Sequence, residues 1–63
     1  MTPESFVKQR HPKMREESHK TNGGQSYWLI REIGETMYFC EGKTRANAWR
    51  NAKEIIEFRE SQP

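Results

Sequence analysis

Two apolar runs separated by a glycine constrain the fold of this chain most strongly. The stretch SYWLIREIGETMYFC is rich in aromatic and β-branched residues, which favour strands. Gly34-Glu35 fits a two-residue turn with glycine in its first position. Such a turn would pair Ile30 with Phe39, whereas a longer turn would change the pairing and exchange the faces. The sequence therefore predicts a β-hairpin over 26–41.

The alternation of side chains along the hairpin sorts them onto two faces. With the two-residue turn, one face carries Trp28, Ile30, Met37 and Phe39. The other face carries Tyr27, Leu29, Arg31, Ile33, Tyr38 and Cys40. If the first face is buried, the apolar residues of the second lie toward solvent, where they would suit a protein partner or a homodimer. The candidate protein-interaction residues are Tyr27, Leu29, Arg31 and Tyr38.

A helical pattern over 44–60 follows the hairpin. Thr44 can cap this helix, and its apolar stripe consists of Ala48, Trp49, Ala52, Ile55 and Ile56. The two alanines would let the helix lie close to the sheet. We expect a core made of Trp28, Ile30, Phe39, Ala48, Ala52 and Ile55.

The first 25 residues predict a short helix and a less certain segment. In TPESFVKQRHP, Thr2 can cap a helix and Pro12 ends it, so we expect a helix over 2–11. Segment 13–20, KMREESHK, is polar and predicts either a weak strand or a linker, and TNGGQ predicts a turn. The whole predicts one α+β domain over 1–63, in which an α-β-β-β-α chain packs an antiparallel sheet on a C-terminal helix.

The small size of the chain argues against an enzyme. Sixty-three residues, of which 32% are hydrophobic, bury too little to enclose a substrate. His11 and His19 could bind metal or act in acid–base chemistry, but no third ligand accompanies them, and they read as surface histidines. Cys40 reads as a buried, inert thiol. We expect no catalytic residue, metal, cofactor or small-molecule substrate.

The same composition shapes what we expect of location and charge. There is no apolar run long enough for a membrane span and no signal-peptide pattern, so we expect a cytoplasmic protein without membrane contact. The 11 Lys and Arg residues exceed the 9 acidic residues by two, and the excess lies in residues 1–25. A small excess of this kind permits contact with nucleic acid or with an acidic protein.

The segment Gly42-Lys43-Thr44 superficially matches a phosphate-binding loop. A nucleotide-binding P-loop has the pattern G-x-x-x-x-G-K-[ST]. If Gly42 is the second glycine of this pattern, the first would stand at position 37, where the sequence has Met37. We therefore exclude nucleotide hydrolysis. The following helix nevertheless carries cations in its first half and glutamates in its second, which opposes its dipole. This placement favours either a solvated polar face or a phosphate contact at the helix start.

The stretch GKTRANAWRNAKEII, with the preceding strands and the short first helix, resembles the double-stranded-RNA-binding domain. That family has the α-β-β-β-α order and enters its second helix through a basic Ser-Lys-Lys-x-Ala-Lys stretch. Thr44 matches the serine, Arg45 the first lysine and Ala48 the alanine. Ala46 and Trp49 replace the other two lysines, and the family's Gly-Pro-x-His loop is absent. The resemblance covers the topology of nearly the whole chain.

This resemblance implies contacts with nucleic acid at the first helix, at the loop between the first two strands and at the start of the second helix. In the family, the first helix and the first hairpin loop touch minor grooves, and the corresponding positions are Glu4, Lys8 and residues 19–24. It implies weak, sequence-independent binding that prefers double-stranded RNA. The candidate nucleic-acid-binding residues are Lys43, Arg45 and Arg50, with Lys8 and Lys20.

Two further resemblances concern the origin of the chain. The Ala48-Trp49-x-Asn51-Ala52 core is similar to small uncharacterised proteins of phages and prophages. The strand, Gly-x-Thr turn and alanine-rich helix are similar to part of the HicB-type antitoxins, although this chain lacks their length and their DNA-binding extension. The phage resemblance supplies an origin and no function. With the exposed hairpin face, the alternative to nucleic-acid binding is a protein-interaction module of phage or mobile-element origin, an inhibitor, antitoxin-like protein or homodimer.

Overall fold

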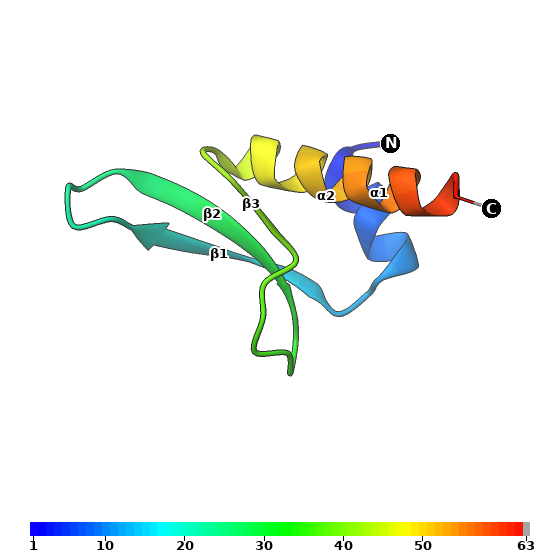
Figure 1. Cartoon of the computed structure of the whole chain (residues 1–63), viewed down its shortest axis with the longest axis horizontal. Helices are drawn as coiled ribbons and strands as arrows, with labels where there is room; N and C mark the ends of the chain where they lie inside the picture. Colours follow the sequence, from blue (N-terminus) through cyan, green and yellow to red (C-terminus); the bar gives the residue numbers. More distant parts are fainter. Residues whose placement is uncertain (63) are drawn as a thin grey trace.

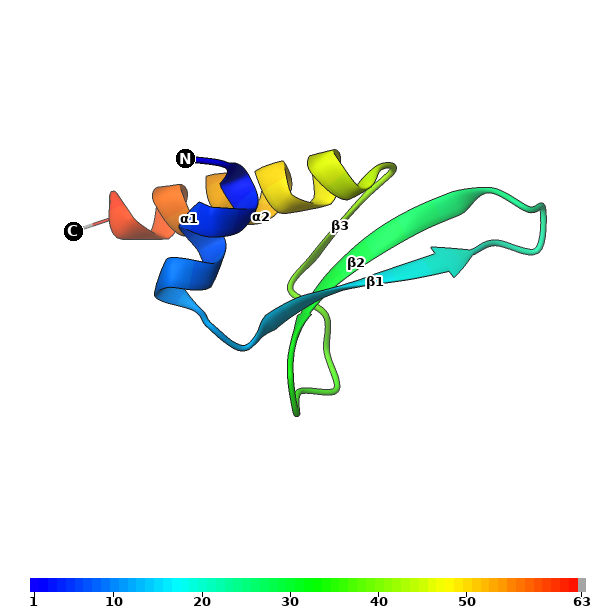
Figure 2. The same ribbon diagram turned by 180° about the vertical axis from the view of Figure 1, so that it is seen from behind.

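The computed structural model describes residues 1–62, which form the expected α-β-β-β-α chain (Figure 1). The elements are α1 (Pro3–Arg10), β1 (Met14–Lys20), β2 (Ser26–Glu32), β3 (Cys40–Gly42) and α2 (Arg45–Glu60). The strands form one antiparallel sheet in the order β1-β2-β3, and α2 packs on one face of it with α1 beside α2 (Figures 1 and 2). The predicted α+β fold class is confirmed. Residue 63, with which the predicted domain ends, lies outside the described residues.

Both helices begin at the threonines that the sequence indicates. The side-chain oxygen of Thr2 accepts a hydrogen bond from the backbone N–H of Ser5, and that of Thr44 accepts one from Asn47, each at 3.1 Å. Each bond satisfies an N–H group that the first helical turn leaves free. The helices therefore occupy nearly the ranges predicted for them.

The polar segment 13–20 is a strand and not a linker. β1 pairs with β2 along its whole length, from Met14 opposite Glu32 to Lys20 opposite Ser26. Met14, the one large apolar residue of this segment, is buried in the core. The turn that joins β1 to β2 closes through hydrogen bonds of Thr21, and Gly24 there has a φ of 85°, which favours glycine.

The predicted two-residue turn at Gly34-Glu35 is wrong, and so is the pairing based on it. Residues 33–39 form a loop between β2 and β3, and Ile30 lies opposite Cys40 instead of Phe39. This shift by one residue moves Cys40 to the same face as Ile30, because successive side chains alternate. Met37, placed on the buried face by the predicted pairing, is 80% exposed in the loop.

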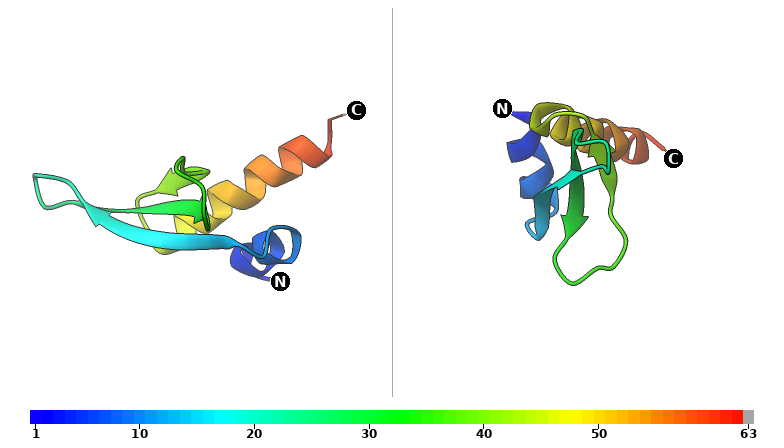
Figure 3. Two further views of the ribbon diagram at one scale, coloured as in Figure 1. Left: turned by 90° about the horizontal axis from the view of Figure 1, so that it is seen from below. Right: turned by 90° about the vertical axis from the view of Figure 1, so that its left-hand side faces the viewer.

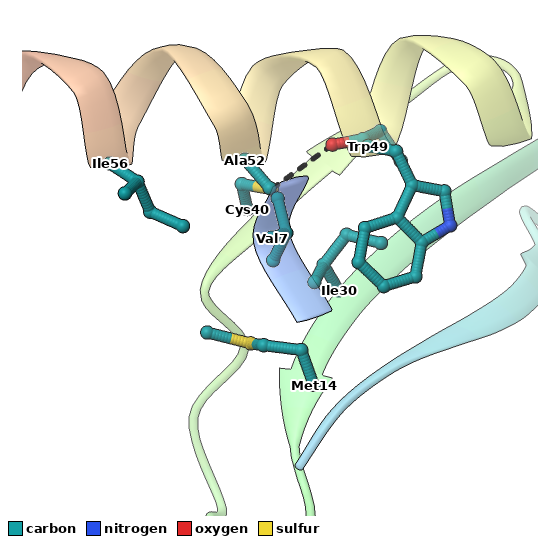
Figure 4. Packing of buried hydrophobic residues seen from close by; sticks show 8 residues of the cluster. Val7, Met14, Ile30, Cys40, Trp49, Ala52 and Ile56 are labelled. Carbon is teal, nitrogen blue, oxygen red and sulfur yellow. Dashed lines mark hydrogen bonds between the residues drawn. The ribbon is translucent and has the colours of Figure 1, made fainter. Parts of the chain in front are cut away.

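The core lies between the sheet and the two helices (Figure 4). Of the expected core residues, Ile30, Ala48 and Ala52 are buried. The other three pack partly buried against the core: Trp28, Phe39 and Ile55. The core also includes five residues that the expected core omits: Val7, Met14, Cys40, Trp49 and Ile56.

The β1–β2 hairpin extends well past the helices (Figure 3). The molecule measures 42 Å along its longest axis and 22 Å along the other two. Lys20, the last residue of β1, therefore lies near the tip of this extension and away from both helices. Along this hairpin, neither helix covers the sheet face that is turned away from α2 (Figure 3).

Candidate functional site

The segment Gly42-Lys43-Thr44 connects the sheet to α2 with very little space. A Cβ atom placed on Gly42 would lie 2.4 Å from the backbone nitrogen of Ala48 and 2.8 Å from its Cα. Only glycine allows the first turn of α2 to cross β3 this closely. Thr44 caps the helix, and the side chain of Lys43 is exposed. The glycine and the threonine of this segment are thus explained by packing and capping, without a bound phosphate.

Arg45 at the start of α2 is held by two carboxylates from other elements. Its Nε lies 2.6 Å from Glu16 Oε2, and its Nη2 lies 2.6 Å from Glu4 Oε1. Trp49 Nε1 donates to Glu16 Oε1 at 3.2 Å. The Arg45 guanidinium beside Glu16 holds the pKa of that carboxyl below its usual value. These bonds join α1, β1 and α2, and they give the arginine a structural use at a position that is unfavourable for a cation in the helix dipole.

The five predicted nucleic-acid-binding residues do not form one patch. Lys8 binds Glu4 at 2.8 Å and lies 5.5 Å from the centre of the Trp49 ring, so Lys8 and Arg45 meet around one glutamate. Lys20 lies at the far end of β1. Lys43 and Arg50 are exposed and have no carboxylate partner among residues 1–62, although Arg50 donates to the Asn47 side chain. The start of α2 therefore presents two available cations.

A second candidate site lies on the sheet face turned away from α2. Because Ile30 and Cys40 point toward α2, the residues on either side of them in the strands point the other way. We call this surface the open face. It carries Arg15, Glu17, His19, Tyr27, Leu29, Arg31 and Glu41.

Tyr38, from the β2–β3 loop, adds an aromatic ring to the open face. Together with Tyr27 and Leu29 it lines an open hollow of about 810 Å³, which is also lined by Glu41 and Lys43. A smaller neighbouring hollow shares Leu29 and Tyr38. The predicted protein-interaction residues Tyr27, Leu29 and Tyr38 are thus brought together in one concave, mainly apolar surface.

Charged side chains follow the β1 side of the open face. Glu17 forms an ion pair with Arg31, and its other carboxylate oxygen lies 3.3 Å from His19 Nε2. The His19 ring stacks on Tyr27 with ring centres 5.5 Å apart and planes at 23°. These contacts fix the orientation of Arg31, the fourth predicted interaction residue, beside the apolar centre.

Sequence reasoning overlooked Glu41 and Lys43 as members of this surface. It wrongly placed Cys40 on this face of the hairpin, although its prediction that the Cys40 thiol is buried is confirmed. In the observed register the Cys40 side chain points toward α2. The sequence allowed this register only through the alternative of a longer turn. The Cys40 thiol donates to the Ala48 carbonyl oxygen at 3.4 Å. Burial raises the pKa of this thiol to about 11, with a smaller contribution from Glu41. Cys40 is therefore a poor nucleophile in the folded chain.

Neither metal nor membrane features are found in the described part of the chain. Within residues 1–62, no three His, Cys, Asp or Glu side chains are arranged to hold a metal ion. His11 Nδ1 lies 3.9 Å from Glu32 Oε1, whereas His19 lies beside Glu17. Over the same residues, neither helix has the length and apolar character needed to cross a bilayer.

Comparison with known proteins finds no relative of this chain. No protein-family profile matches it, and no curated protein or solved structure is significantly similar to it. Inferences about its function therefore depend on its own residues and their geometry.

Proposed function

We propose that this chain is a non-enzymatic binding module that contacts a protein partner through the open face. The observation that carries this proposal is the meeting of Tyr27, Leu29 and Tyr38 around one open hollow. Apolar and aromatic side chains surrounded by polar groups are typical of protein-binding surfaces. The inhibitor or antitoxin-like role predicted from the sequence would use this same face.

The open face and its hollow carry charges of both signs, Glu17 and Glu41 together with Arg15, Arg31 and Lys43, which suits a protein surface. Glu17 and Glu41 flank Leu29 on the two neighbouring strands. Their carboxylates would repel a phosphate backbone laid across the strands, whereas a protein can match both signs of charge. Arg31 is paired with Glu17, whereas Arg15, which lies opposite Arg31, has no carboxylate partner among residues 1–62.

Affinity capture with matched variants tests this proposal. The immobilised chain is exposed to a host lysate, and the retained protein is compared between wild type and the variants Leu29→Ser, Tyr38→Ser and Phe58→Ser. Phe58 is the control because it is 66% exposed on α2. We expect the Phe58 variant to retain the partner and the other two to lose it, with unchanged circular dichroism. Retention that survives both open-face substitutions would contradict the proposal.

Lys43 and Arg50 support a second candidate function, contact with nucleic-acid backbone at the start of α2. Both are exposed cations without a carboxylate partner among residues 1–62. They lie on either side of residues 44–49, which resemble the basic stretch of the double-stranded-RNA-binding domain, and their positive charges oppose the dipole of α2. Since Arg45 is bound to Glu4 and Glu16, such binding would be weak and would rest on few phosphates.

A titration at two salt concentrations tests the second candidate. Duplex RNA, duplex DNA and single strands are added to wild type and to Lys43→Gln, Arg50→Gln and the control Arg59→Gln. We expect an affinity for duplex DNA that falls with salt at a slope of about −0.9 per phosphate contacted, with duplex RNA preferred. Lys43→Gln and Arg50→Gln should each weaken binding and Arg59→Gln should not. No NMR shift at residues 43–50 at low salt would contradict this function.

A further inference from the structure

The β2–β3 loop, residues 33–39, projects away from the helices (Figures 1 and 2). Two of its apolar side chains are exposed. Met37 is 80% exposed and Ile33 is 53% exposed. The loop is nevertheless anchored at both ends. The Glu35 N–H bonds to the Glu32 carbonyl at 3.1 Å, and the Phe39 N–H bonds to the Ile30 carbonyl at 2.6 Å. An anchored loop with a solvent-exposed methionine is suited to insertion into an apolar recess.

The chain itself contains a matching recess. The open hollow beside this loop is lined by Tyr27, Leu29 and Tyr38, and the chain's own Met37 stays outside it. Charge is compatible with the match: among residues 1–62, Glu35 near the loop tip has no ion-pair partner and neither has Lys43, which lines the hollow next to Glu41. One molecule therefore carries both halves of a contact that it does not make with itself.

We propose that a second copy of this chain occupies the open face, each copy inserting its β2–β3 loop into the hollow of the other. Met37 of one copy would enter the hollow between Tyr27 and Leu29 of the second copy, and Glu35 would pair with its Lys43. Because loop and hollow adjoin through Tyr38, a two-fold axis between the copies makes both contacts at once and closes the assembly. This inference rests on the proposed function, of which it names the partner.

Charge reversal measured by sedimentation equilibrium tests this inference. Wild type is expected to associate to a dimer between micromolar and millimolar concentration. Glu35→Lys and Lys43→Glu should each raise the dissociation constant about tenfold or more, because like charges then face each other at two symmetric sites. The double variant carrying both reversals should recover to within about threefold of wild type. Glu54→Lys, a charge reversal on α2, serves as the control and should leave the constant unchanged.

Substitution of the loop methionine provides a second readout. Met37→Ser is expected to weaken the dimer at least as much as either charge reversal, and an exposed loop residue can be changed without loss of the fold. A single-chain mass at every concentration would overturn the inference, as would a double variant no tighter than the single ones. If the chain stays monomeric but captures another protein through Leu29 and Tyr38, the second copy is excluded and the proposed function stands.

Discussion

Gly42 lies directly against the backbone of Ala48, so that a methyl group on Gly42 would approach the Ala48 nitrogen to 2.4 Å. This contact is where β3 and the first turn of α2 cross. Gly42 also pairs with Trp28 of β2, so one residue joins the register of β3 to the position of α2. The open face is thus set by packing on the opposite side of the sheet.

We expect Gly42→Ala to lower the free energy of unfolding by about 1–3 kcal/mol, as overpacking against fixed backbone does. Gly23→Ala is the matched control, since a Cβ atom there would lie 3.7 Å from Thr21 Oγ1, an ordinary contact. The control should change stability by less than about 0.5 kcal/mol. Urea unfolding of the two variants measures both values, and equal effects would show that the crossing is looser than described.

Ala52→Leu should destabilise the chain by about 1–3 kcal/mol, because Ala52 is fully buried where α2 packs on the rest of the core. Ala46→Leu, at an exposed position of the same helix, is expected to be nearly neutral. Thermal melting compares the two variants. A melting temperature of Ala52→Leu equal to that of wild type would contradict the close approach of α2 to the sheet.

Local patterns made much of the fold predictable from the sequence. Thr2 and Thr44 cap their helices through residues three positions away, and the alanines at 48 and 52 repeat at helical spacing. β1 was harder to predict because its only large apolar residue, Met14, reaches the core through pairing with a later strand. The strand register could not be read from Gly34, since it depends on the distant crossing at Gly42.

The predicted sites show the same division. Tyr27, Leu29 and Arg31 alternate along one strand, so their common face could be predicted from that strand alone. Arg45 was predicted to be available for phosphate because its partners, Glu16 and Glu4, lie 29 and 41 positions away in the sequence. An ion pair across such separations leaves no local pattern to read.

Acid should weaken the fold through Glu16. Since hydrogen bonding to Arg45 lowers the pKa of Glu16 from its usual 4.5, the folded chain binds this proton less readily than the unfolded chain does. The contribution to stability is present above pH 4.5 and is lost as the pH falls through the lowered value. Arg45→Gln should therefore be less stable than wild type at neutral pH, and this gap should narrow in acid.

Urea unfolding of wild type and Arg45→Gln, at about pH 7 and about pH 3, measures that gap. Arg50→Gln is the control, because no carboxylate among residues 1–62 pairs with Arg50, and its difference from wild type should not depend on pH. If wild type and Arg45→Gln differ in unfolding free energy by the same amount at both pH values, the Arg45–Glu16 pair does not contribute to stability.

Cys40 should resist alkylation while the chain is folded. Its thiol pKa of about 11, against an ordinary 9.0, leaves about a hundredth of the usual thiolate at neutral pH, and the side chain is buried as well. Iodoacetamide is expected to label the protein slowly in buffer and rapidly in denaturant, as followed by mass spectrometry. Equal rates in the two conditions would contradict the placement of Cys40 in the core.

The open face as the binding surface is tested most directly by hydroxyl-radical footprinting. The dilute chain is compared with the chain in its assembled state, whether that assembly holds a second copy or another protein. We expect Tyr27, Leu29 and Tyr38 to become protected on assembly, while Phe58, exposed on α2, stays equally labelled. Protection of Phe58 with unchanged labelling of both tyrosines would contradict the assignment of the open face as the binding surface.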